Sequence, residues 1–198
     1  CCLVLSISAQ IARDEIFEDI YTLAGYRAGE IQLESLKLLP GTEMRHRADE
    51  LGIRYSPLPP YEVLQTGEIS VGELQTARRL SRLLDAFYNT PAWQELTREL
   101  ILNDRRFLYR FLAYLTEANL IDQPMSLERR GLVLYEYCKQ YYPDYRTQAS
   151  IAWIEAGMSL KKLPAEHVKT KRQIPPEHWE VIYGNYKPEL RLCFLPVS

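Results

Sequence analysis

The sequence predicts a mainly α-helical protein in which a partial α/β unit precedes a helical, bundle-like domain. First, apolar runs and amphipathic helix patterns alternate as strand, helix, strand and helix over residues 3–52. Second, apolar residues recur at helical spacing in four successive segments over residues 70–142, joined by short links. Three prolines within residues 57–60 separate these patterns, and we place a domain boundary near residue 60.

The α/β unit contains two expected strands, at Leu3–Ile7 and Ile31–Leu39, with a helix at Arg13–Tyr26 between them. A short helix, capped by Thr42, is expected to stop at Gly52. This order favours a parallel sheet covered by helices. Because two strands do not make a stable sheet alone, the remaining strands are expected from elsewhere.

The helical region begins with the capping-box pair Ser70 and Glu73. Three further helices are expected to start at the capping residues Thr90, Asp104 and Ser126.

Three other segments show weaker patterns. Residues 53–70 are expected to be irregular because of their prolines. Arg146–Leu160 is expected to be helical, and residues 179–183 to form a short helix or turn. Leu190–Val197 alternates loosely, which is typical of a terminal edge strand.

The composition is that of a globular protein, with 46% hydrophobic and 25% charged residues. The net charge of -2 gives no overall field for nucleic acid or an anionic membrane, and no apolar run approaches the roughly 20 residues that span a bilayer. The first residue, Cys1, indicates an internal fragment of a longer product; a lipoprotein cysteine is disfavoured because apolar residues follow at once. We therefore expect a cytoplasmic protein without membrane or nucleic-acid partners.

Few residues form patterns that indicate chemistry. The four cysteines do not make a disulfide framework, and Cys138 is expected to be a buried structural thiol. The sequence contains no GxSxG motif and no glycine-rich phosphate loop. We expect the three histidines and the basic residues 161–172 to lie on the surface, and the tyrosines of residues 135–145 mainly to pack.

The segment from Glu34 to Thr42 is the most informative one for function. Lys37 lies in an otherwise apolar expected strand, where a lysine is costly to bury unless it is paired or faces a wet cavity. Loops at the carboxyl ends of parallel strands face the ligand site in α/β barrels, and Gly41 permits a tight turn there. The alternative is a lysine that reaches solvent at an open edge. Glu34, Lys37, Gly41 and Thr42 are therefore the candidate substrate-chamber residues, with no catalytic or metal-binding residue predicted in this chain.

The runs IQLESLKLLPGTEMRHR (31–47), ADELGIRY (48–55) and SPLPPYEVL (56–64) resemble the late barrel segment of cobalamin-binding radical SAM proteins. Residues 69–89, which end in LLDAFYN, resemble the start of the helical C-terminal domain of unknown function that follows this barrel in one subgroup.

The resemblance implies that residues 1–60 are the end of a radical SAM barrel and residues 61–198 the helical domain. The parent enzyme would bind a 4Fe-4S cluster, S-adenosylmethionine and cobalamin, and would act as an oxidoreductase or a methyltransferase-like enzyme. Its partners here would be the upstream barrel and the cobalamin-binding domain of the same polypeptide, together with an unknown substrate. The CxxxCxxC motif that ligates such a cluster is absent from this sequence, so the fragment alone is expected to bind no cofactor and to be inactive.

Two other classes of function remain open. The helices could form a non-catalytic protein–protein interaction module, with the aromatic surface of residues 135–145 as the docking patch. Nucleic-acid contact through the basic residues 161–172 is a weaker alternative, because no recognition motif accompanies them.

Overall fold

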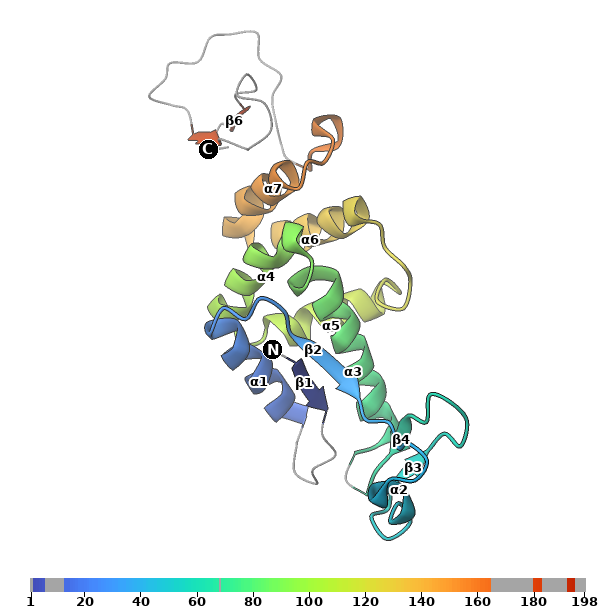
Figure 1. Cartoon of the computed structure of the whole chain (residues 1–198). Helices are drawn as coiled ribbons and strands as arrows, with labels where there is room; N and C mark the ends of the chain where they lie inside the picture. The colour runs from blue at the N-terminus through green and yellow to red at the C-terminus, as the bar shows by residue number, and fades with distance from the viewer. Residues whose placement is uncertain (1, 6–12, 68, 165–179, 183–191, 195–198) are drawn as a thin grey trace. The chain divides into compact units, whose positions relative to one another are not determined.

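The computed structural model describes residues 2–5, 13–67, 69–164, 180–182 and 192–194, and the side chains of most of them (Figure 1). The chain divides into two compact units, Cys1–Pro124 and Met125–Ser198, which we describe separately. Most described elements are helices, so the predicted mainly α-helical class is confirmed. No helix within the described residues is both long and apolar enough to cross a membrane.

The first unit opens with a β–α–β arrangement of β1 (Cys2–Leu5), α1 (Arg13–Gly25) and β2 (Gln32–Ser35). The two strands are parallel, with Cys2 opposite Gln32 and Leu5 opposite Ser35. The predicted order of elements and the parallel pairing are therefore confirmed. The second strand is shorter than the expected Ile31–Leu39.

Burial alternates along β2. The side chains of Ile31 and Leu33 are buried, whereas those of Gln32 and Glu34 are exposed. The alternation has the period of two expected of a strand with one covered face. The helix α3 (Val71–Leu83) packs against β2.

After β2 the chain forms a small lobe, which we define as residues 36–69. It contains α2 (Glu43–His46) and the antiparallel strands β3 (Arg54–Tyr55) and β4 (Val63–Gln65). Figure 1 shows these elements gathered at one end of α3, away from α4 and α5. The core of the lobe is formed by Leu38, Ala48, Ile53, Val63 and the helical residue Leu74.

The lobe corrects two expectations. Residues 53–70 are not irregular throughout, because the apolar side chains of Ile53 and Val63 are buried and bring two short strands together. The expected helix over residues 42–52 ends at His46 and continues as turns, which close at Gly52 with a positive φ of 63°. Glycine adopts this left-handed conformation without steric cost.

The helix α3 begins at the predicted capping box. The Ser70 side chain accepts from the Glu73 backbone N–H, and the Glu73 carboxylate accepts from the Ser70 backbone N–H. The helix then passes into a π-helical turn, η1 (Leu84–Tyr88). The predicted apolar face is buried along both segments, at Leu74, Ala77, Leu80, Leu84, Phe87 and Tyr88.

Two further helices, α4 (Pro91–Asn103) and α5 (Phe107–Glu117), complete the first unit. Phe111 of α5 lies 4.9 Å from the ring of Phe87 and 5.4 Å from that of Phe107, measured between centroids. These contacts place aromatic packing at the centre of the helical part.

The predicted caps of α4 and α5 are only partly right. Thr90 precedes α4, but its hydroxyl donates to the Asp85 carbonyl of the π turn instead of capping the helix. Asp104 accepts from the Arg106 backbone N–H, and the helix starts three residues later, at Phe107. Its side chain therefore closes a turn before the helix.

The second unit contains α6 (Leu127–Tyr141), the 3-10 turn η2 (Pro143–Tyr145), α7 (Arg146–Glu155) and the 3-10 turn η3 (Leu160–Lys162). Ser126 caps α6 as predicted, accepting from the Arg129 backbone N–H. The strands β5 (Glu180–Ile182) and β6 (Leu192–Phe194) pair antiparallel.

The short helix or turn expected over residues 179–183 is wrong for residues 180–182, which form a strand because they pair with 192–194. The edge strand expected within Leu190–Val197 is confirmed at β6. The predicted domain boundary near residue 60 falls inside the first compact unit, since β2 and β4 both pack on α3. The division between modules at residue 60 stays a prediction.

Candidate functional site

The four predicted chamber residues lie on β2 and on the chain that follows it. Beyond β2 the backbone stays paired: Lys37 lies opposite Glu62, the Leu38 N–H donates to the Tyr61 carbonyl at 2.9 Å, and the Val63 N–H donates to the Leu36 carbonyl at 3.1 Å. The segment thus ends in a short antiparallel pairing with the lobe. This pairing fixes where the following turn begins.

The turn after Leu38 is held by bonds from Thr42. The backbone N–H and the hydroxyl of Thr42 both donate to the Leu39 carbonyl, at 3.3 and 2.8 Å. Gly41 has a φ of 82°, so a residue with a side chain would be strained there. Thr42 occupies the N-cap position of α2 as predicted, but its hydroxyl closes the turn and does not cap the helix.

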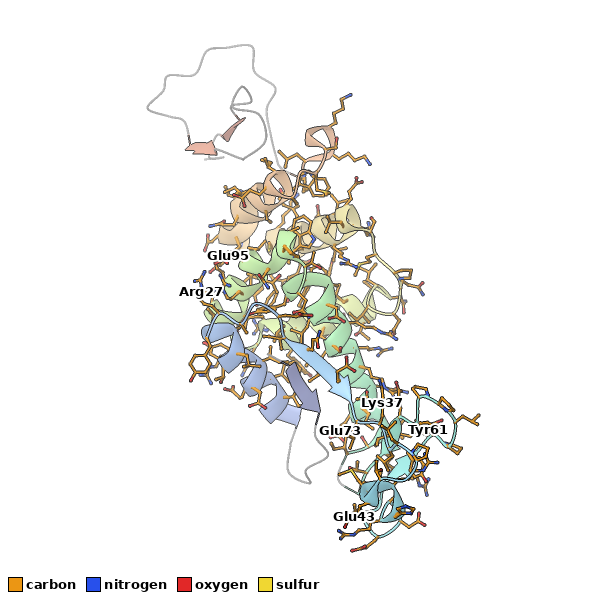
Figure 2. All side chains as sticks on the ribbon, viewed as in Figure 1. Arg27, Lys37, Glu43, Tyr61, Glu73 and Glu95 are labelled. Atoms are coloured by element: carbon orange, nitrogen blue, oxygen red, sulfur yellow. The ribbon has the colours of Figure 1, made fainter. Side chains whose placement is uncertain are left out.

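Glu34 lies on β2, whereas Lys37 lies two residues beyond the end of this strand. Glu34 is exposed on the face of β2 opposite the buried Leu33. Lys37 is also exposed and lies directly opposite Glu62, and facing residues of an antiparallel pair project to the same side. Glu62 accepts from Arg78 at 2.8 Å, so Lys37 projects on the side of this ion pair. Figure 2 shows Lys37 where β2 joins the lobe, with Glu43 at the far end of the lobe.

One residue that the sequence did not single out connects the turn to the rest of the lobe. The Arg45 guanidinium carbon lies 4.9 Å from the ring centroids of both Tyr55 and Tyr61, and its Nη1 donates to the Leu38 carbonyl at 3.0 Å. Cation–π contacts and a charge-assisted hydrogen bond therefore meet at one side chain. No spacing in the sequence indicated this cluster, because its members come from four separate segments.

A second polar cluster positions the start of β2. The Asn89 side chain accepts from the Ile31 N–H and donates to the Ile31 carbonyl, both at 2.9 Å, much as a neighbouring strand would. The hydroxyl of Tyr88 donates to the Ala28 carbonyl at 2.7 Å, and burial raises the pKa of Tyr88. Tyr88 ends the π turn η1 and Asn89 is its C-terminal capping residue, so the end of this turn anchors the loop before β2.

The described residues do not offer a donor set for a metal or an iron–sulfur cluster. No group of three His, Cys, Asp or Glu side chains that could hold a metal ion occurs among them. Cys138 is buried as predicted, and burial raises its pKa to about 12, so the thiol is protonated at neutral pH. A protonated, buried thiol is a poor metal ligand.

The remaining candidates lie outside the segment 34–42 in the sequence. His46 is exposed as predicted, whereas His167 and His178 lie outside the described residues. Lys161 and Lys162 are exposed, and the basic residues beyond residue 164 also lie outside the described part. In the second unit the ring of Tyr137 lies 4.8 Å from that of Tyr141, which is 51% exposed.

The first unit also has a pocket of about 240 Å³ between α3 and α5. Arg79 on its wall is engaged by Asp122, and the hydroxyls of Thr76 and Thr116 donate to carbonyls of their own helices. The hydroxyl hydrogens of both threonines are thus already used, and the Arg79 guanidinium is already paired with a carboxylate.

Comparison with known families identifies the chain. The model of a protein family of unknown function, DUF4080, matches residues 49–161, more than half of the 198 residues. The chain therefore belongs to this family. No curated protein and no solved structure matches it.

The matched span begins within the small lobe and ends within η3. Glu34, Lys37, Gly41 and Thr42 precede it, whereas Tyr55, Tyr61 and Asn89 lie inside it. The family match thus covers most of the helical part, and the β1–α1–β2 arrangement lies outside it.

Proposed function

We propose that this chain is the C-terminal region of a cobalamin-binding radical SAM enzyme, an oxidoreductase or methyltransferase-like protein of the cytoplasm. In this proposal β1, α1 and β2 form the end of the partial barrel, the turn after β2 helps wall the substrate chamber, and the helices cover it. The observation that carries the proposal is the parallel β1–α1–β2 arrangement, followed by a turn fixed at the carboxyl end of β2.

The exposed face of β2 supports the same proposal. In α/β barrels, side chains of each strand alternate between the helices and the interior. Ile31 and Leu33 are buried, whereas Gln32 and Glu34 are exposed on the opposite face. This exposed face would be the side of β2 that points into the barrel once further strands enclose it. Glu34 would then line the chamber.

The catalytic groups of the parent would be held by residues upstream of this chain. When bound, the 4Fe-4S cluster supplies the electron that cleaves S-adenosylmethionine, and cobalamin supplies a group carrier. The residues of this chain would bind and orient the substrate and exclude water from it.

The full-length protein tests this proposal. We expect protein purified without oxygen to contain iron and to show the electron paramagnetic resonance signal of a reduced 4Fe-4S cluster. With a reductant it should also convert S-adenosylmethionine to 5′-deoxyadenosine. Protein that is folded, reconstituted with iron and sulfide, and still devoid of both properties would overturn the proposal.

The chamber role of Lys37 needs its own variant. Lys37→Ala in the full-length enzyme should weaken substrate binding or slow turnover, because a cation near the chamber is removed. Lys161→Ala is the matched control, since Lys161 is an exposed lysine of the second unit. Unchanged substrate affinity and turnover in Lys37→Ala would show that this lysine only reaches solvent.

A docking role for the helical part is the second candidate. The exposed ring of Tyr141, packed on Tyr137, favours it, because exposed aromatic side chains are enriched at interfaces. Tyr141→Ala in the complete chain should abolish co-purification of a partner, whereas Tyr109→Ala, which removes a tyrosine of similar exposure in the first unit, should not. Equal recovery of the partner with both variants would reject this surface.

A further inference from the structure

We propose that Arg45 is a positioning residue that holds the turn Leu39–Thr42 in a single conformation. The inference deepens the proposed function, because this turn carries Gly41 and Thr42 at the proposed chamber wall. Arg45 itself need not touch a substrate. It acts through the backbone of Leu38, which leads into the turn.

The Arg45 side chain contacts several segments of the lobe. Its guanidinium has the ring of Tyr55 and that of Tyr61 each at 4.9 Å from Cζ, and its Nη1 donates to the Leu38 carbonyl at 3.0 Å. Tyr55 belongs to β3 and Tyr61 to the loop before β4, so one side chain of α2 links three other segments of the lobe. A planar guanidinium satisfies such contacts together, whereas an ammonium group does not.

The apolar core of the lobe holds the residue that precedes the turn. Leu38 is 1% exposed and packs with Ala48, Ile53 and Val63. This packing holds the Leu38 side chain at the start of the turn. The hydrogen bond from Arg45 holds the Leu38 backbone carbonyl. Past Leu38 the chain is exposed through residue 44, so few buried contacts hold the turn itself.

The turn also contains hydrogen bonds of its own. Thr42 bonds twice to the Leu39 carbonyl, and the Arg45 N–H donates to the Thr42 carbonyl at 3.1 Å. These bonds close the loop locally, and the Arg45 side chain connects it to the strand pairing of Leu38 with Tyr61. Loss of the guanidinium should thus free the turn while leaving the helices intact.

Amide hydrogen exchange of the 198-residue chain tests this directly. Arg45→Met should accelerate exchange at the amides of Leu38, Thr42 and Arg45 about 10- to 100-fold, as loss of one local tie to a solvent-exposed segment would. Exchange in α5 and the thermal midpoint should stay close to wild type. Arg45→Lys should recover only part of the protection, because it keeps the charge and loses the planar contacts.

Arg47→Met is the matched control. Arg47 lies in the same segment, is exposed, and pairs with Glu50 at 2.9 Å. It should leave the exchange rates of the turn unchanged. Equal exchange in Arg45→Met and wild type, or equal acceleration in Arg47→Met, would overturn the positioning role.

The outcome is separable from that of the proposed function. If Arg45→Met frees the turn but the full-length protein neither holds a cluster nor cleaves S-adenosylmethionine, the positioning role stands and the radical SAM proposal fails. If the full-length protein shows both properties and the turn does not respond to Arg45→Met, the positioning role fails alone.

Discussion

The small lobe and the helical part of the first unit are held together by different kinds of contact. In α3, η1, α4 and α5, large apolar side chains such as Phe87, Phe107 and Phe111 are fully buried against one another. In the lobe, a five-residue apolar core is supplemented by the Arg45 contacts and by backbone pairing. The helical part should therefore set the global stability, and the lobe should open more readily.

The largest expected effect comes from the helical core. Phe111→Ala removes a ring that is 0% exposed, meets the ring of Phe87 edge-to-face and stacks on that of Phe107. We expect the free energy of unfolding to fall by about 3–5 kcal/mol. Chemical denaturation measures the change, and a loss below about 1 kcal/mol would show that the helical part is not the stabilising core.

A smaller and more local effect is expected in the lobe. Leu38→Ala should lower the free energy of unfolding by about 2–3 kcal/mol. The loss stays moderate because the lobe core is small and its partly exposed neighbours can close around the cavity. Amide exchange should rise first within residues 36–69 and less in α5. Uniform acceleration in both regions would contradict the division between lobe and helices.

The capping box between the two regions should contribute less again. Ser70→Ala removes the side-chain acceptor of the Glu73 N–H at the start of α3. The free energy of unfolding should fall by about 1 kcal/mol. Thermal unfolding measures the change. Thr76→Ala serves as the control, because the Thr76 hydroxyl only donates to the Gly72 carbonyl within the same helix.

The smallest effect concerns pH. The hydrogen bond from Arg79 lowers the pKa of Asp122, and the charges of both Arg79 and Arg82 act in the same direction. A carboxyl with a lowered folded-state pKa stabilises the fold above its unfolded pKa, and this contribution is lost as the pH falls through the folded-state pKa. Because Asp122 is 42% exposed, we expect its carboxylate to contribute less than about 1 kcal/mol to the free energy of unfolding.

The pH dependence is checked with Asp122→Asn. The variant should be slightly less stable than the wild type at neutral pH, and the two should converge in acid. A stability difference that grows as the pH falls would have the wrong sign for this carboxyl.

The sequence predicted the helical part well because long apolar faces and caps are local signals. The face from Leu74 to Tyr88 and the cap at Ser126 could be read directly from spacing. The parallel order of β1 and β2 followed from the alternation of strand and helix patterns.

The contacts of the candidate site could not be read in this way. Arg45, Tyr55 and Tyr61 come together only through the folding of the lobe, and the pairing of Asn89 with Ile31 joins residues 58 positions apart. The strands of two and three residues in the lobe are too short for a periodic pattern. Thr42 was placed correctly at the N-cap position of α2, but its hydroxyl bonds to the Leu39 carbonyl and does not cap the helix.

One assay on the full-length protein decides whether this chain belongs to a radical SAM enzyme. Reduced without oxygen and given S-adenosylmethionine, it should release 5′-deoxyadenosine, and Lys37→Ala should change the dependence of turnover on substrate concentration once a substrate is known. Complete absence of 5′-deoxyadenosine from folded protein with a fully assembled cluster would contradict the assignment of this chain to a radical SAM enzyme.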